Sequence, residues 1–253
     1  MGNLKEVLEK RLEKLKESSV GQVELQTYKC TKCKDRMFIE KDGGYIPCDC
    51  RQVRIAEEKL KQSGISEEFK TKRFNNFNAN RSSSIKQAYG SSIEYIKQFK
   101  QIKNTRHNSI MLCGQVGSGK THLASAISNK LLEGCVGVIY MPYRLTITKL
   151  KQSITDKINF QREMNKYQNA QVLFIDDLFK GKYTESDINI IYEIVDYRYL
   201  KNLPMIITTE KTIDDLIDID EAIASRIYEM SKGFTTTIEG KELNYRIYGS
   251  YIV

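Results

Sequence analysis

Short apolar runs alternate with amphipathic stretches along most of the chain, from residue 109 onward. The runs that predict strands are 110–113, 136–141, 172–175, 205–208 and 234–238. Strands that alternate with helices indicate a parallel sheet with helices on both faces. Ligands of such sheets bind beyond the carboxyl ends of the strands. The pattern therefore predicts an α/β domain whose site lies where these runs end.

Helical periodicity with an apolar stripe marks several other segments. Helices are expected at 3–18, 51–62, 85–102, 145–168 and from a capping box at 184–187 to residue 200. The helix at 85–102 offers Ala88, Ile93, Ile96 and Phe99 to a core. The helix at 3–18 is too short and too charged to be stable alone. It packs on its own protein or docks on a partner, and its leucine stripe fits both uses.

The strand expected at 110–113 leads into a glycine-rich loop. The loop reads Gly114-Gln115-Val116-Gly117-Ser118-Gly119-Lys120-Thr121, and a helical segment opens at His122. Strand, loop and helix in this order predict a P-loop, whose backbone N–H groups face phosphate oxygens. Lys120 would reach the β- and γ-phosphates, and the Thr121 hydroxyl would bind Mg²⁺. A glycine-rich loop that matches by chance is the alternative.

Two adjacent carboxylates end the strongest apolar run, at Asp176 and Asp177. The run before them suits a strand buried on both faces of a parallel sheet. Asp176 would hold Mg²⁺ through water, and Asp177 would orient or deprotonate an attacking water. The other interpretation is a buried strand that ends in an acidic turn, with Asp177 as a helix cap.

Four of the six cysteines form two close pairs. They are Cys30 and Cys33, then Cys48 and Cys50, with a hairpin pattern between the pairs. This is typical of a zinc ribbon, and because both histidines lie far away, four thiolates would hold a structural zinc ion. Unligated buried cysteines are the alternative. The remaining two, Cys113 and Cys135, are expected to pack as small apolar residues.

Composition sets the limits of these interpretations. A chain of 253 residues with 40% apolar content can form one α/β core with a small appendage. The expected domains are 1–64 and 65–253. No apolar run approaches the ~20 residues that span a membrane, and no signal peptide opens the chain, so the expected location is cytoplasmic. The net charge of +8 favours nucleic acid as a partner, or a diffusely basic solvated surface.

Basic and aromatic residues near the predicted site leave further alternatives open. The expected helix at 145–168 carries Lys149, Lys151, Lys157, Arg162 and Lys166, which would face a nucleic-acid backbone or only solvent. Aromatic residues at 69, 74 and 77 would shelter an adenine base or fill the edge of the domain. Arg226 and Arg246 are each a surface arginine or a group that stabilises phosphate charge.

Together these segments resemble the DnaC/DnaI family of replicative helicase loaders, within the AAA+ ATPases. The resemblance rests on residues 114–124, 173–178 and 204–209 and covers 65–253, and the cysteine-rich region resembles the zinc module of the DnaI branch. It implies a five-stranded parallel sheet with an abbreviated lid, and ATP and Mg²⁺ bound at residues 114–122, His122 included. The helix at 145–168 occupies the place of the single-strand DNA-binding helix of this clan.

The resemblance also implies roles for individual polar residues. Thr208 falls where the family has its sensor 1 residue, and Glu210 stands where the family often has asparagine. Arg226 lies in the region that supplies an arginine finger to a neighbouring subunit, and Arg246 matches the sensor 2 arginine. With Lys120, Asp176 and Asp177 they form the expected catalytic set.

The expected function is therefore ATP-dependent loading of a DnaB-type hexameric helicase onto single-stranded DNA. The N-terminal helix and zinc module would bind the helicase, and the ATPase domains would assemble with ATP into an oligomer resembling a hexameric spiral. A transposition helper ATPase of the IstB type has very similar core motifs and is the main alternative. A small-molecule P-loop kinase and a non-enzymatic ATP-binding adaptor fit the sequence less well.

Overall fold

The computed structural model describes residues 28–41, 43–240 and 243–248. The helix expected at 3–18 lies outside these ranges. The chain divides into two compact units, Met1–Arg51 and Gln52–Val253. Within the described ranges, no helix combines the length and apolar character needed to cross a membrane.

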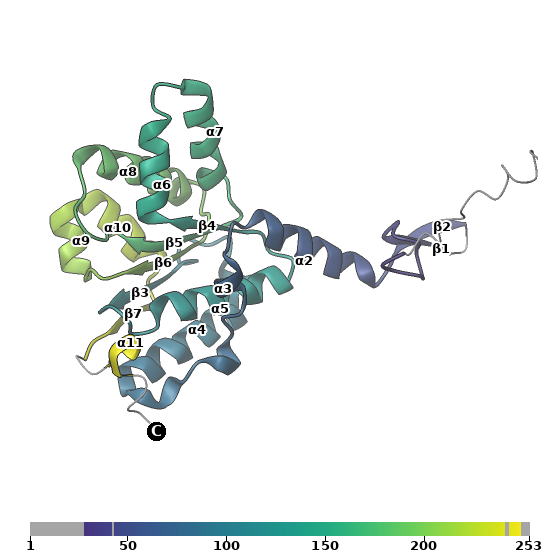
Figure 1. Ribbon diagram of the computed structural model, residues 1–253, viewed down its shortest axis with the longest axis horizontal. Helices are drawn as coiled ribbons and strands as arrows, with labels where there is room; N and C mark the ends of the chain where they lie inside the picture. The colour runs from purple at the N-terminus through teal and green to yellow at the C-terminus, as the bar shows by residue number, and fades with distance from the viewer. Residues whose placement is uncertain (1–27, 42, 241–242, 249–253) are drawn as a thin grey trace, which may run out of the picture. The chain divides into compact units, whose positions relative to one another are not determined.

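The described part of the first unit contains an antiparallel hairpin (Figure 1). Two cysteines precede the hairpin in the sequence and two follow it. Strand β1 (Phe38–Lys41) pairs with β2 (Gly44–Pro47), and Phe38 lies opposite Pro47. Gly43 in the turn has a φ of 78°, a conformation that glycine adopts at little cost. The predicted hairpin is confirmed.

Helix α2 (Cys50–Gln62) contains the division between the units, which is earlier than the expected boundary between residues 64 and 65. Residues 52–64 belong with the second unit because they pack on it. The Sγ of Cys135 lies 3.1 Å from the carbonyl oxygen of Gln52, and the N–H of Tyr140 donates to the carbonyl of Ser63 over 2.8 Å. Leu60 packs against the core, and such packing stabilises a helix of modest intrinsic stability.

A five-stranded parallel sheet forms the centre of the second unit, in the order β4-β5-β6-β3-β7. The strands are β3 (Ile110–Gly114), β4 (Val138–Pro142), β5 (Val172–Leu178), β6 (Met205–Thr209) and β7 (Thr235–Ile238). All five expected strands are present, and the predicted parallel α/β fold is confirmed. Strand β5 continues through both aspartates to Leu178, further than the apolar run predicted.

Alternating residues of the strands enter two separate cores, one on each face of the sheet. In β3, Ile110 and Leu112 join one core, whereas Met111 and Cys113 join the other. Figure 1 shows the corresponding helical layers on opposite sides of the sheet. Helices α3 (Glu67–Lys70), α4 (Ser83–Ile102) and α5 (Lys120–Glu133) lie on the first face, and α6 (Tyr143–Gln152), α7 (Lys157–Gln168), α8 (Glu185–Leu200), α9 (Ile213–Ile219) and α10 (Glu221–Met230) on the second.

The helix expected at 145–168 is wrong as one element, because the segment forms two helices, α6 and α7. The side chain of Asp156 accepts the N–H of Asn159 over 3.0 Å and so caps the second helix. This capping restarts the chain as a new helix after a turn at 153–156. The basic residues of this segment are consequently distributed over two helices.

Other helix predictions agree more closely with the structure. The side chain of Thr184 accepts the N–H of Asp187, which confirms the capping box that opens α8. In α4, Ala88 and Phe99 are buried as expected, but Ile93 and Ile96 are only half-buried. Tyr95 is fully buried instead. Its hydroxyl donates to the carbonyl oxygen of Asn108 over 2.9 Å, which satisfies the polar end of this buried side chain.

Candidate functional site

The glycine-rich loop, residues 114–119, joins β3 to the first turn of α5. Gly114, Gly117 and Gly119 all have positive φ values, between 75° and 124°. Lys120 begins α5 and donates to the carbonyl oxygens of Gly114 and Gln115, both over 2.7 Å. Burial lowers the pKa of Lys120, and the nearby carboxylates of Asp177 and Glu210 oppose this effect. The loop therefore has the conformation and the charge that phosphate binding requires.

Replacing Gly114 by alanine is expected to destabilise the protein by about 3 kcal/mol or more. An added Cβ would lie 2.1 Å from the backbone oxygen of Ile238 in β7, and φ is 124° there. Thermal unfolding of Gly114→Ala should therefore show a clearly lower midpoint. Gly90→Ala in α4 is the control: its Cβ meets nothing within 4 Å, and alanine should stabilise the helix slightly. Equal midpoints for the two variants would contradict this interpretation of the loop.

Asp176 is the centre of a hydrogen-bond network at the carboxyl end of β5. Its Oδ1 accepts from the hydroxyls of Thr121 (2.9 Å) and Thr208 (2.6 Å), and its Oδ2 accepts from Tyr140 (3.0 Å). Burial raises the pKa of Asp176, and these hydrogen bonds work in the opposite direction. A hydroxyl and a carboxylate in contact are oxygen ligands of the type that Mg²⁺ prefers, so the predicted pair of Thr121 and Asp176 fits that ion.

Asp177 lies beside this network in a less common backbone conformation, with a φ of 58°. Its N–H donates to the hydroxyl of Thr208 over 2.8 Å. Its carboxylate is paired with Lys180, whose ammonium group lies 2.8 Å from Oδ2. Thr208, fully buried in β6, therefore contacts both aspartates and fixes their relative positions.

These residues surround a cleft of about 600 Å³. The predicted residues that line it are Val116, Gly117, Gly119, Lys120, Thr121, His122, Asp176, Asp177 and Arg246. The lining does not include four other predicted residues, Gly114, Gln115, Ser118 and Thr208. The structure adds residues that the sequence did not single out for the site, notably Arg81, Lys180 and Tyr245. It also places Glu210, noted above only for standing where the family often has asparagine, in the lining.

Phe77 and Arg81, which precede α4 in the chain, line one side of the cleft. Arg81 donates to the carbonyl oxygen of Ser118 over 3.2 Å, and its guanidinium lies over the rings of Phe77 and Tyr245. Tyr245 belongs to α11 (Tyr245–Tyr248), and its N–H donates to the carbonyl of Gly117 over 2.9 Å. Of the aromatic residues considered as shelter for a base, Phe69 and Phe77 line the cleft and Phe74 does not. All three are partly buried and pack against the core.

His122 and the two predicted arginines have different surroundings. The Nε2 of His122 lies 3.0 Å from the carbonyl oxygen of Arg73, and burial lowers the pKa of the imidazole. Arg246, in α11, lines the cleft. Arg226, in α10, does not: its Nε pairs with Asp196 over 2.9 Å, and its guanidinium lies over the ring of Tyr199. A role of Arg226 at the site of a neighbouring subunit stays a prediction.

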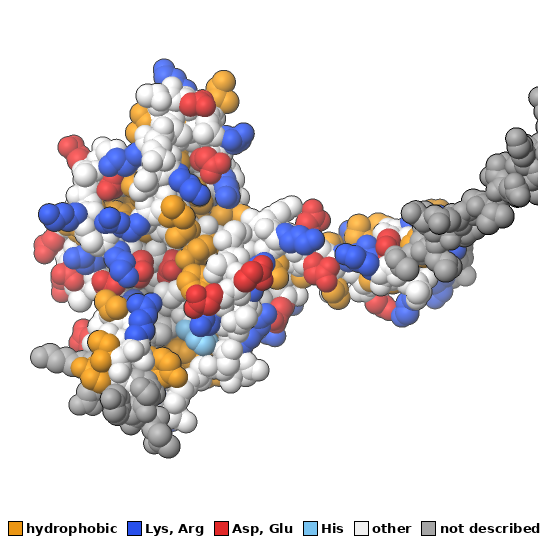
Figure 2. Space-filling view, in the orientation of Figure 1, with side chains coloured by type: hydrophobic (Ala, Val, Ile, Leu, Met, Phe, Trp, Pro, Cys, Tyr) orange, Lys and Arg blue, Asp and Glu red, His pale blue; other side chains and the backbone are white. Residues whose placement is uncertain are grey.

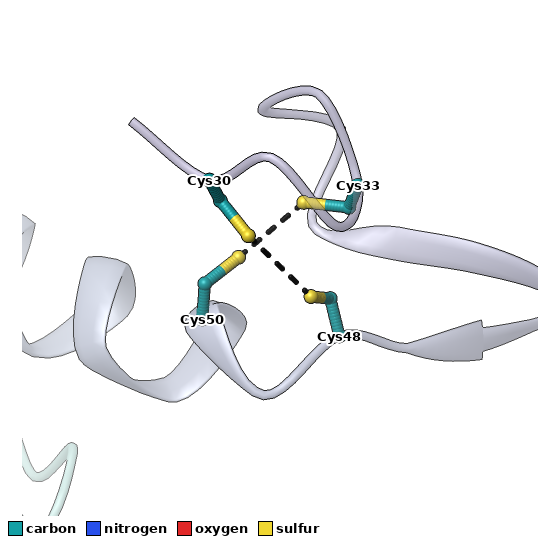
Figure 3. Close-up of side chains that lie close together, drawn as sticks. All are labelled: Cys30, Cys33, Cys48 and Cys50. Carbon is teal, nitrogen blue, oxygen red and sulfur yellow. Dashed lines mark hydrogen bonds between the residues drawn. The ribbon is translucent and has the colours of Figure 1, made fainter. Parts of the chain in front are cut away.

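The four cysteines of the first unit converge on one point (Figure 3). Their Sγ atoms all lie within 4.8 Å of one another, with 3.8 Å between Cys30 and Cys48 and 3.4 Å between Cys33 and Cys50. A tetrahedral zinc ion with bonds of about 2.3 Å places sulfurs about 3.8 Å apart, so the cluster fits zinc. Cys50 is also the first residue of α2, so the helix fixes the position of this fourth sulfur.

The comparisons with known proteins concern mainly the second unit. The model of the family described as IstB-like ATP binding protein matches residues 49–230. The phage-like element PBSX protein XkdC of Bacillus subtilis (strain 168) is 38% identical over 241 residues, which cover 88% of this chain and 87% of that protein.

Two solved structures have the same fold as the second unit. The DnaI structure aligns with a TM-score of 0.60 and 20% identity, over 70% of this chain and 95% of that one. The DnaC helicase loader aligns with a TM-score of 0.59 and 20% identity, over 69% of this chain and 100% of that one. At 20% identity, these structural matches show that the fold is shared. The family model and the similarity to XkdC show family membership. This chain belongs to the IstB-like ATP-binding protein family.

Proposed function

We propose that this protein is an ATPase that loads a DnaB-type hexameric helicase onto single-stranded DNA at the start of replication. The observation that carries the proposal is a four-cysteine unit placed before an ATPase unit with the fold of the DnaI and DnaC structures. The N-terminal region, with the cysteine unit, would bind the helicase. The matched family segment begins at residue 49, so most of this unit lies outside that segment.

Different residues at the cleft would bind the phosphates, hold Mg²⁺ and orient the attacking water. The N–H groups of residues 114–119 and the ammonium group of Lys120 would hold the phosphates. Thr121 and Asp176 would hold Mg²⁺, which neutralises phosphate charge when it is bound. Asp177 would orient the attacking water, Thr208 keeps both aspartates in place, and Arg246 would approach the phosphates from α11. Water attacks the γ-phosphorus, the bond to the bridging oxygen breaks, and ADP and phosphate result.

ATP would also control assembly and DNA contact. Arg226 would complete the site of a neighbouring subunit, so ATP would favour an oligomer and hydrolysis would release it. Helices α6 and α7 are the proposed surface for single-stranded DNA. Their basic residues are not all free, since Lys151 forms an ion pair with Asp187 over 2.7 Å. Figure 2 shows basic and acidic side chains intermixed on the visible face, without a broad basic surface there, so the proposed DNA contact would be a local one.

A defined complex with the replicative helicase of its host is the expected result when the protein is mixed with it in the presence of ATP and Mg²⁺. Light scattering after gel filtration would give the mass with and without nucleotide. The Lys120→Ala variant is the control, because it lacks the phosphate-binding ammonium group and should lose any dependence on ATP.

The absence of a complex in both conditions, with ATP hydrolysis intact, would contradict the loader proposal. It would favour the second candidate function, a helper ATPase of transposition. The observation behind that candidate is the family model, which carries the IstB description. A transposase would then be the partner to test, in the same measurement.

A further inference from the structure

Lys180 lines the cleft together with Lys72 and Lys120, and no role has been assigned to it so far. Its ammonium group lies 2.8 Å from Oδ2 of Asp177 and 2.9 Å from Oε1 of Glu210. The side chain is 37% exposed and lines the cleft together with Lys120 and Thr121. The group therefore lies at the proposed phosphate site and is accessible from it.

The backbone that carries Lys180 is held firmly. Phe179, with 1% of its surface exposed, anchors the segment against Tyr143 at a ring distance of 5.5 Å. Arg144, in α6, donates to the carbonyl oxygens of Lys180 and Lys182, both over 3.3 Å. Because the backbone is fixed on both sides of Lys180, the position of its Cα is set by the fold, and only its flexible side chain can change partners.

Lys180 and Lys120 interact electrostatically with each other and with the same two carboxylates, Asp177 and Glu210. Asp177 and Glu210 each raise the pKa of Lys120, and the positive charge of Lys180 lowers it. For Lys180 itself, burial lowers the pKa, but the hydrogen bonds to Asp177 and Glu210 and the negative charges of these carboxylates together raise it above its usual value. Lys180 is thus a charged ammonium group within electrostatic reach of the lysine of the P-loop. A triphosphate would add several negative charges and compete with both carboxylates for it.

We propose that Lys180 binds the terminal phosphate of the nucleotide, and that this exchange of partners frees the Asp177 carboxylate to hold the attacking water. A compact ammonium group on a four-carbon stem suits such an exchange. Glu210 holds Lys180 near the cleft when the phosphate is absent. The inference rests on the proposed ATPase function and adds a residue that distinguishes nucleotides by their third phosphate.

The test compares nucleotide affinities of Lys180→Met and wild-type protein by titration calorimetry with Mg²⁺. The probes are ADP and AMPPCP, a non-hydrolysable ATP analogue. Lys180→Met is expected to bind AMPPCP about 10-fold more weakly and ADP within about 2-fold of the wild type, because only AMPPCP has the third phosphate. Lys182→Met is the matched control, since Lys182 is an exposed lysine two residues away that does not line the cleft, and it should leave both affinities unchanged.

A second variant changes Glu210, the other carboxylate that is paired with Lys180. Glu210→Gln removes one carboxylate that competes for Lys180, so the affinity for AMPPCP should rise more than the affinity for ADP, and the ratio of the two should increase about 3-fold. An unchanged ratio of AMPPCP to ADP affinity in both variants would overturn the inference and leave Lys180 as a structural ion pair. If the wild-type protein bound neither nucleotide, the proposed ATPase function itself would fail, and this outcome is distinct from the first.

Discussion

Replacing Asp177 by asparagine is expected to lower the rate of ATP hydrolysis by about 10²- to 10⁴-fold. Asparagine has nearly the same shape, and the backbone N–H of residue 177 would still donate to Thr208. The amide cannot accept a proton from water or orient it as a carboxylate does. Nucleotide binding should persist, because the glycine-rich loop and Lys120 are unaltered. Steady-state phosphate release and nucleotide titration would measure the two effects separately.

The control for this variant is Asp214→Asn, which makes the same change of charge at an exposed position of α9. It should hydrolyse ATP at the wild-type rate. A wild-type rate in Asp177→Asn would show that another group orients the water. An equally low rate in both variants would indicate a general effect of charge on the protein rather than a role for this carboxylate.

Removal of zinc is expected to unfold the first unit and to leave the second one folded. Structural zinc sites bind with apparent free energies of about 10–16 kcal/mol, far more than a short hairpin gains from its own packing. The described hairpin exposes Phe38, Tyr45 and Ile46, so it has little core of its own. Metal analysis of the full chain should give about one zinc ion per chain, and Cys48→Ser should lose it.

Helicase binding and nucleotide binding should then respond differently. Cys48→Ser is expected to lose the complex with the helicase and to retain its affinity for nucleotide, because the two compact units divide between Arg51 and Gln52. Cys135 lies outside the four-cysteine cluster, so Cys135→Ser is the matched control. This variant should bind as much zinc as the wild-type protein. Full zinc content in Cys48→Ser would overturn the assignment of the cluster as a metal site.

The parts of the site that could be predicted from sequence are those that depend on local geometry. The spacing of the P-loop and the position of Asp176 at the end of β5 follow from residues adjacent in the chain. The four cysteines were also recognisable, because a hairpin brings its two ends together.

The residues that were missed reach the cleft through local backbone conformation or through strand pairing, neither of which is visible in the spacing of residue types. Lys180 enters it because Asp177 and Phe179 both have positive φ values, which the sequence does not reveal. Glu210 meets Lys180 because β6 pairs with β5 across an irregularity between Ile175 and Leu178. The break between α6 and α7 was missed because apolar periodicity continues across it, although Asp156 followed by a helical pattern was an available capping signal.

The order of strands in the sheet has a consequence for the synthesis of this protein. Strand β3, which ends at the phosphate-binding loop, lies between β6 and β7, two strands that are made much later. Gly114 pairs with Ile238, and Gly117 accepts a hydrogen bond from Tyr245. The loop therefore cannot reach its final conformation until almost the whole second unit has left the ribosome. Nascent chains stalled before β7 should be unable to bind nucleotide, whatever their sequence at the loop.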